Sequence, residues 1–262
     1  MRKSIQNFAN ALMPLGMALA ITACNDEDLP RPGHSNAEIN STLTSSNSDA
    51  NSSADISSPE SRIGIGAFTV TEFTLGMQEV NMMYLPESAV EAGVSLEIGT
   101  LKTNIDAEIG TSSSKPQTIT LAADGEIRKA KIGEGETPKG VYSEITFKLY
   151  KNTAAGGHEA ASSNSLFITG DHNGTPVHIW LETEEMIMAT SKSADGYEVD
   201  GNSSLLLTFN LDKIFANVNF DLASDFDKNG TIEIGPHNAD ANGSLHSKIK
   251  SNFASSVEFV KE

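Results

Sequence analysis

Short segments in which apolar and polar residues alternate run along the chain from residue 63 to about residue 211. The clearest is 101–109, Leu-Lys-Thr-Asn-Ile-Asp-Ala-Glu-Ile, where every second residue is apolar or small. A period of two is typical of a strand with one face in the core and the other in water. The pattern predicts a mainly β protein, with strands over 67–75, 77–85, 94–99, 101–109, 117–122, 126–132, 141–150, 166–169, 177–182, 185–189 and 205–211.

Clusters of Gly, Pro, Asp and Asn separate these segments. Asp124-Gly125 is a good hairpin turn between two of them, because a two-residue turn needs left-handed backbone that Asp and Gly tolerate. Many short strands with turns at this spacing predict an antiparallel β-sandwich or β-barrel over residues 63–262. The small, polar segment 152–165 is either an internal boundary of this region or the tip of a long hairpin.

Helical periodicity occurs only near the C-terminus, where four apolar residues recur at intervals of four positions. This spacing keeps them on one face of an amphipathic helix, for which Asn242 or Ser244 is a suitable N-cap. We expect this C-terminal helix to cover one side of the sheet. A shorter helical turn is expected over 212–217, with Ile214 and Phe215 facing inward. The apolar face of the longer helix consists of Leu245, Ile249, Phe253 and Val257.

The N-terminus has the features of an export signal. An apolar run over 8–23 follows a basic start, is interrupted by Pro14 and Gly16, and ends in small residues before Cys24, the only cysteine. It is shorter than the roughly 20 residues of a membrane-spanning helix. The stretch resembles the bacterial lipobox, which implies that residues 1–23 are removed and that Cys24 carries a lipid anchor.

The segment that follows is rich in Ser, Asn, Asp and Pro, and its apolar residues are isolated. Such a composition buries too little surface to offset the entropy lost on ordering the backbone. We therefore expect a disordered tether over 24–62, between the lipid and the folded region.

The charge of the chain limits its partners. Two basic residues leave with the signal peptide, which takes the formal net charge from −17 to −19. So acidic a surface repels nucleic acid and anionic headgroups, and this argues against a nucleic-acid partner. A cationic, metallic or neutral polysaccharide partner is favoured. With Cys24 modified, the chain also has no thiol for disulfides or catalysis.

The segment 225–233 resembles a calcium loop. It matches the first nine positions of an EF-hand loop, with side-chain oxygens at positions one, three and five and a glycine at six. Position twelve departs from the pattern, because Pro236 stands where a bidentate glutamate is normal, although Asp221, Asn238 or Asp240 could complete the shell. The alternative is an Asx-rich turn. The expected calcium ligands are Asp225, Asp227, Asn229, Thr231 and Glu233.

Two other groups of residues suggest softer metals. His172 and His178 flank a turn and could approach each other with Asp171, in a set that would suit zinc or copper. Their spacing matches no established ligand motif, so exposed turn histidines are the favoured interpretation. Methionines invite a copper(I) interpretation, but Met186 and Met188 have the spacing of a core face, so packing is favoured.

No catalytic motif is recognisable. The glycines of 133–136 lack the third glycine of a dinucleotide fingerprint, and the chain has no G-x-S-x-G, H-E-x-x-H or P-loop sequence. Trp180 lies in a predicted strand, where a place in the core is favoured over a sugar-stacking platform. We therefore expect a protein that is not an enzyme, with an unrecognised hydrolase using a carboxylate pair as an alternative.

One stretch carries a resemblance to a family. Residues 140–147, Gly-Val-Tyr-Ser-Glu-Ile-Thr-Phe, resemble a strand of uncharacterised bacterial envelope lipoproteins with prealbumin-like β-sandwich domains. The order of 205–215, an acidic loop and a terminal helix is similar to the second half of some of these proteins. The resemblance implies a fold and a location, and it transfers no catalytic residue.

Together these features predict a lipid-anchored envelope protein that acts as a non-catalytic binding or structural module, stabilised by calcium. Residues 25–28, Asn-Asp-Glu-Asp, resemble the acidic export signal of surface-exposed lipoproteins, which implies an outer-membrane location facing outward; a periplasmic face is the alternative. The expected partners are the membrane, through the lipid, and an extracellular glycan or protein. A periplasmic copper- or zinc-handling protein is the rival function.

Overall fold

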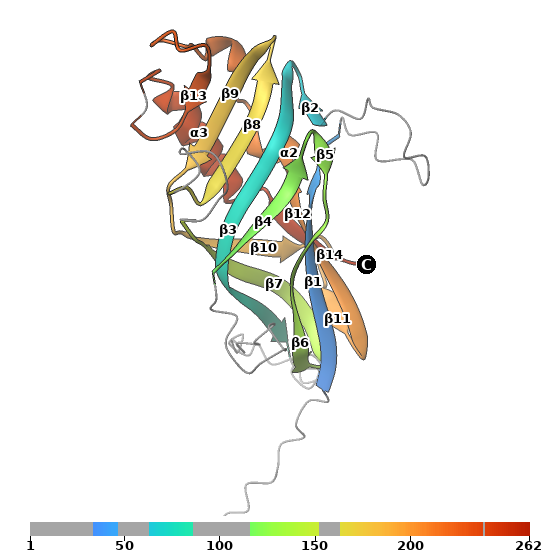
Figure 1. Ribbon diagram of the computed structural model, residues 1–262. Helices are drawn as coiled ribbons and strands as arrows, with labels where there is room; N and C mark the ends of the chain where they lie inside the picture. The colour runs from blue at the N-terminus through green and yellow to red at the C-terminus, as the bar shows by residue number, and fades with distance from the viewer. Residues whose placement is uncertain (1–33, 47–62, 86–115, 152–162, 238) are drawn as a thin grey trace, which may run out of the picture. The chain divides into compact units, whose positions relative to one another are not determined.

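The computed structural model describes residues 34–46, 63–85, 116–151, 163–237 and 239–262 (Figure 1). The signal peptide, Cys24 and the strands expected over 94–99 and 101–109 lie outside these residues. So does most of the segment 152–165.

The described chain is mainly β, as the alternating pattern predicts. Its helical elements are α2 (Leu211–Ile214), the 3-10 turn η2 (Phe220–Leu222) and α3 (Gly243–Phe253). The strands are β1 (His34–Thr44), β2 (Ile63–Ile65), β3 (Phe68–Leu85), β4 (Gln117–Ala123), β5 (Glu126–Ile127), β6 (Ala130–Pro138), β7 (Gly140–Leu149), β8 (Leu166–His172), β9 (Thr175–Leu181), β10 (Met186–Ser191), β11 (Tyr197–Val199), β12 (Asn202–Asn210), β13 (Ile232–Ile234) and β14 (Val257–Lys261).

All strands belong to one mixed sheet whose main path runs β13-β9-β8-β3-β7-β10-β14-β12-β1-β6. Three neighbouring pairs are parallel, namely β1 with β12, β10 with β14, and β13 with β9. The expectation of a purely antiparallel sheet is therefore wrong. Alternation reveals a strand but carries no information about its direction, and each parallel pair joins segments separated by a long crossover.

Strand β1 corrects the expected tether, because residues 34–44 lie inside the sheet between β12 and β6 (Figure 1). Ala37, Ile39 and Leu43 are at most 2% exposed and face the core. Ile39 lies opposite Leu205 of β12. The apolar residues that are isolated in sequence have the two-residue period of a strand, and the sheet supplies the burial that the segment cannot provide by itself.

The long strand β3 joins the two strands that the sequence predicts separately over 67–75 and 77–85.

The turn at Asp124-Gly125 is as predicted, since both residues have positive φ, 57° and 79°, and Ala123 pairs with Glu126 across it. Positive φ at both central residues defines the type I′ hairpin turn, which matches the twist of the flanking strands.

The sheet curls around a single hydrophobic core. Strands β3 and β12 are four steps apart in the sheet, a separation of about 19 Å if the sheet were flat. Nevertheless Phe73 of β3 and Phe209 of β12 have ring centroids only 6.2 Å apart. The outer strands also meet, because the side chain of Gln117 in β4 donates to the carbonyl of Ile132 in β6 at 3.0 Å.

Helix α3 confirms the predicted C-terminal helix, with Leu245, Ile249 and Phe253 buried. Phe253 stacks on Phe209 with centroids 6.1 Å apart, which fixes the helix on the core. Val257, the fourth residue of the predicted face, lies instead in β14. The short helix α2 is also as predicted, because Ile214 and the following Phe215 are buried.

Candidate functional site

The predicted calcium loop connects η2 to β13, and a second loop leads from β13 to α3. These loops bring the carboxylates of Asp225, Asp227 and Asp240 together, with one ligand oxygen of each within 4.8 Å of the others. Asp227 is exposed, whereas Asp240 is 1% exposed. Asp240 was one of three candidates to complete the shell, and the structure brings it to the two predicted ligands.

Hydrogen bonds within the loop order its polar groups. The carboxylate of Asp225 accepts from the backbone N–H groups of Asn229 at 3.0 Å and Gly230 at 2.9 Å. Asp227 also accepts from the N–H of Asn229, and the Asn229 side chain accepts from the N–H of Thr231. These contacts fix the carboxylate orientations without using every lone pair, since each carboxylate oxygen has two.

Asp240 connects the two loops to the sheet. One of its oxygens accepts from the N–H groups of Phe226 at 2.7 Å and Asp227 at 3.3 Å, and the other accepts from Glu233 at 2.7 Å. The nearby Asn242 side chain also links separate segments, because it donates hydrogen bonds to the backbone carbonyls of Ser224 and Glu233. Asn242 therefore precedes α3 without capping it through its side chain.

Glu233, the ninth position of the predicted loop, lies in β13 beside this cluster. Its pKa is raised, first by desolvation and then by the negative charges of Asp240, Asp227 and Asp225. The site thus concentrates acidic groups that repel one another, and a bound cation would relieve that repulsion.

The two histidines do not come together. His178 of β9 lies opposite Thr169 of β8. His172 is on β8, three residues after Thr169, and lies opposite Thr175 of β9. Residues three apart on a strand face opposite sides of the sheet, so His172 and His178 cannot share a metal ion. The expectation that both are exposed turn histidines is also wrong, because His172 is 8% exposed and its Nε2 lies 3.1 Å from Asp221.

The methionines in the described part of the chain differ in burial. Met77 and Met82 are fully buried, whereas Met186 and Met188 of β10 are 54% and 50% exposed. The favoured core interpretation of Met186 and Met188 is therefore wrong. Their two-residue spacing establishes that they share a face but not which face, and the inward positions of β10 belong to Ile187 and Ala189.

Trp180 lies at the margin of the core rather than inside it, since its side chain is half-buried. Its indole covers the backbone of Gly235, just after β13. The indole N–H donates to Glu182 at 3.3 Å.

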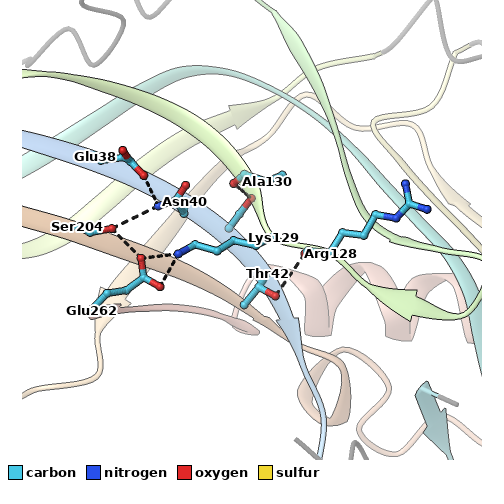
Figure 2. A network of polar contacts seen from close by, with 9 residues as sticks. Glu38, Asn40, Thr42, Arg128, Lys129, Ala130, Ser204 and Glu262 are labelled. Atoms are coloured by element: carbon cyan, nitrogen blue, oxygen red, sulfur yellow. Dashed lines mark hydrogen bonds and ion pairs between the residues drawn. The ribbon is translucent and has the colours of Figure 1, made fainter. Parts of the chain in front are cut away.

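A polar network on β1 and its neighbours has no counterpart among the predictions (Figure 2). The Lys129 ammonium donates to both carboxylate oxygens of Glu262, and the Ser204 hydroxyl donates to one of them at 2.7 Å. Asn40 of β1 donates to Ser204 and Glu38. Lysine and serine hydrogen bonds hold the pKa of Glu262 below its usual range. Four segments distant in sequence meet here, so no local motif could reveal the network.

A shallow hollow of about 520 Å³ adjoins this network. It shares Glu38 and Ser204 with the network. Lys131 lies 2.7 Å from Glu134 and 3.7 Å from Glu38, so one ammonium group serves two carboxylates there. The residues around the hollow include Asn36, Glu38, Glu134, Gly135, Asn202 and Ser204.

Comparison of the chain with protein-family models, curated proteins and solved structures gives no match. Among the described residues, no helix combines the length and apolar character needed to cross a membrane.

Proposed function

We propose that the protein is a lipid-anchored, non-catalytic binding or structural module of the cell envelope, and that Ca²⁺ stabilises the two loops that flank β13. The observation that carries the calcium part is the convergence of Asp225, Asp227 and Asp240. Ca²⁺ takes six to eight oxygen ligands in flexible geometry, and carboxylates are its usual protein ligands. In the pattern of an EF-hand loop, the side chain of Asn229 and the backbone carbonyl of Thr231 would add to the three carboxylates.

The ion would act by joining segments that are separate in the sheet. Asp225 and Asp227 belong to the loop before β13, and Asp240 belongs to the loop before α3. A cation held by all three would couple both loops to the edge strand β13. It would also offset the repulsion that raises the pKa of Glu233.

The expected effect is a higher melting temperature in millimolar Ca²⁺ than in chelator, measured on the same preparation. Asp227→Ala should abolish the increase, because it removes an exposed ligand without disturbing the buried Asp240. Asp195→Ala changes an exposed aspartate outside the cluster and should retain the full increase. An absent calcium effect, or an equal loss in Asp195→Ala, would refute the calcium site.

The envelope part of the proposal rests on the sequence. The lipobox supports a lipid on Cys24, and the acidic residues 25–28 support an outward-facing place on the outer membrane. The resemblance of 140–147 supports a two-layer, prealbumin-like arrangement and the envelope location. Incorporation of radiolabelled palmitate that is lost in Cys24→Ser would support the anchor. Protease treatment of intact cells then separates an outward-facing chain, which is cleaved, from a periplasmic one, which survives.

The partner that best fits the acidic surface of the protein and the hollow beside β1 is a neutral glycan or a protein. The net charge of −17 opposes anionic partners, and the residues that line the hollow beside β1 include amide, hydroxyl and carboxylate groups. Screening of the purified chain against neutral glycans, with Asn202→Ala as the hollow variant, tests this surface. Equal binding by the variant would remove the hollow from the proposal.

A further inference from the structure

The exposed face of β10 has a feature that the proposed function does not explain. Met186 and Met188 stand side by side on that face, 54% and 50% exposed, while Ile187 between them is 2% exposed. Leaving two large apolar side chains in water gives up the free energy of their burial, which is about 25 cal/mol per Å² of apolar surface. The strand could carry polar residues there at no cost to the core.

The neighbouring strand does not cover these side chains. In β7, Lys148 lies opposite Met186, and Thr146 lies opposite Met188. On the other side of β10, pairing with β14 is confined to Thr190 and Ser191. The two thioethers are therefore accessible and are bordered by polar groups in the described part of the sheet.

We propose that Met186 and Met188 together bind Cu(I) through their two sulfur atoms. Thioether sulfur is a soft, neutral ligand that favours Cu(I) over hard cations such as Ca²⁺ and Mg²⁺. Residues two apart on a strand are separated by about 6.6 Å. Metal–sulfur bonds of about 2.3 Å, as for zinc thiolates, place two opposed sulfurs about 4.6 Å apart. Each flexible methionine therefore needs to lean only about 1 Å towards the other.

The charged groups across the ladder have both signs. Lys148 lies opposite Met186, and Glu144, two residues from Thr146, lies opposite Thr190. The chain as a whole carries a net charge of −17, which concentrates cations at its surface. This site is independent of the carboxylate cluster, because it uses different ligands, a different metal and different strands.

The first test uses the full chain labelled with ¹³C at the methionine methyl groups, with Cys24 blocked by N-ethylmaleimide so that its thiol cannot bind the metal. Ag(I), a redox-stable substitute for Cu(I), is titrated while methyl spectra are recorded. The methyl signals of Met186 and Met188 should shift together and saturate at one equivalent. Those of the buried Met77 and Met82 should not move, and they serve as internal controls. No shift at Met186 and Met188, or equal shifts at all methionines, overturns the proposal.

The second test measures Cu(I) affinity by competition with a chromophoric Cu(I) chelator. Met186→Leu and Met188→Leu keep side-chain volume and exposure, and each should weaken binding at least about tenfold, since one thioether alone binds poorly. Met83→Leu alters a methionine on β3 that has no partner at this spacing and should bind as the unmodified chain does. Binding that survives in the Met186→Leu/Met188→Leu double variant overturns the proposal, as does absence of Cu(I) binding by the unmodified chain.

Discussion

Lys129 and Glu262 are 133 residues apart in sequence, yet the Lys129 ammonium lies 2.7 Å and 2.8 Å from the two carboxylate oxygens of Glu262. The contact attaches the C-terminal residue to the segment before β6 (Figure 2). Because Ser204 donates to the same carboxylate, three separate segments are joined at one group.

Glu262→Gln should destabilise the protein modestly, by about 0.2–1 kcal/mol, the range for exposed ion pairs. The folded-state pKa of Glu262 is lowered, so its contribution is present above the unfolded-state pKa and is lost as pH falls through the folded-state pKa. Urea unfolding measured from pH 7 downwards should therefore show a difference from the unmodified chain at pH 7 that shrinks as the pH falls. Glu126→Gln, an exposed control, should show none.

Asp240→Ala should cost more than any other single change in the acidic cluster. The substitution leaves three partly buried backbone N–H groups without their acceptor, and even one such group left unsatisfied costs about 1–3 kcal/mol where water cannot reach it. Urea unfolding in chelator measures the loss without any contribution from calcium. Asp227→Ala is the comparison, and a loss as large in Asp227→Ala would contradict the structural role of Asp240.

Glu233→Gln should stabilise the calcium-free protein at neutral pH. The folded-state pKa of Glu233 is raised, so the ionised group opposes folding, and stability falls as pH rises from the unfolded-state pKa through the folded-state pKa. The stability of Glu233→Gln should not fall in this way as pH rises, so at pH 7 in chelator the variant should melt at a higher temperature than the unmodified chain. Equal melting temperatures from pH 4 to pH 7 in the unmodified chain would contradict the assignment.

Gly235→Ala should destabilise the protein by about 1–3 kcal/mol, as overpacking does elsewhere. A Cβ atom at Gly235 would lie 2.0 Å from the indole of Trp180, so the ring must move. Trp180 is the only tryptophan, and its fluorescence spectrum should report the displacement directly. Gly243→Ala places a methyl group in open space and should leave both spectrum and stability unchanged.

Ile39→Ala should cost about 2–5 kcal/mol, the range for truncating a buried isoleucine. Ile39 is fully buried in β1, so thermal unfolding should show a large fall in melting temperature. Thr42→Ala on the outer face of the same strand should cost less, since its hydroxyl bond to the Arg128 carbonyl is long at 3.4 Å. Similar values for the two variants would place Ile39 outside the core.

The parts of the fold that depend on local chemistry could be predicted. The turn at Asp124-Gly125 and helix α3 follow from residues adjacent in sequence, and so does the loop that presents Asp225 and Asp227. In each case, the neighbours that decide the conformation lie within a few positions.

What could not be predicted depends on long-range packing. The strand at Ile39 lacks enough apolar residues to be recognised, because most of its stabilisation comes from β12 and β6. The exposed Met186 and Met188 show that a period of two does not distinguish the inner from the outer face. Asp240 approaches Asp225 from a different loop, so the spacing of an EF-hand could not select it from the other candidates, Asp221 and Asn238.

The position of β1 determines how the anchor would hold the protein. Only nine residues separate Cys24 from His34, where the strand begins, so a lipid on Cys24 would hold the start of β1 within about 35 Å of itself. A pull on the lipid would run along β1, whose hydrogen bonds to β12 on one side and β6 on the other cross its axis. If Cys24 carries the lipid, those bonds would be loaded together in shear rather than broken one at a time.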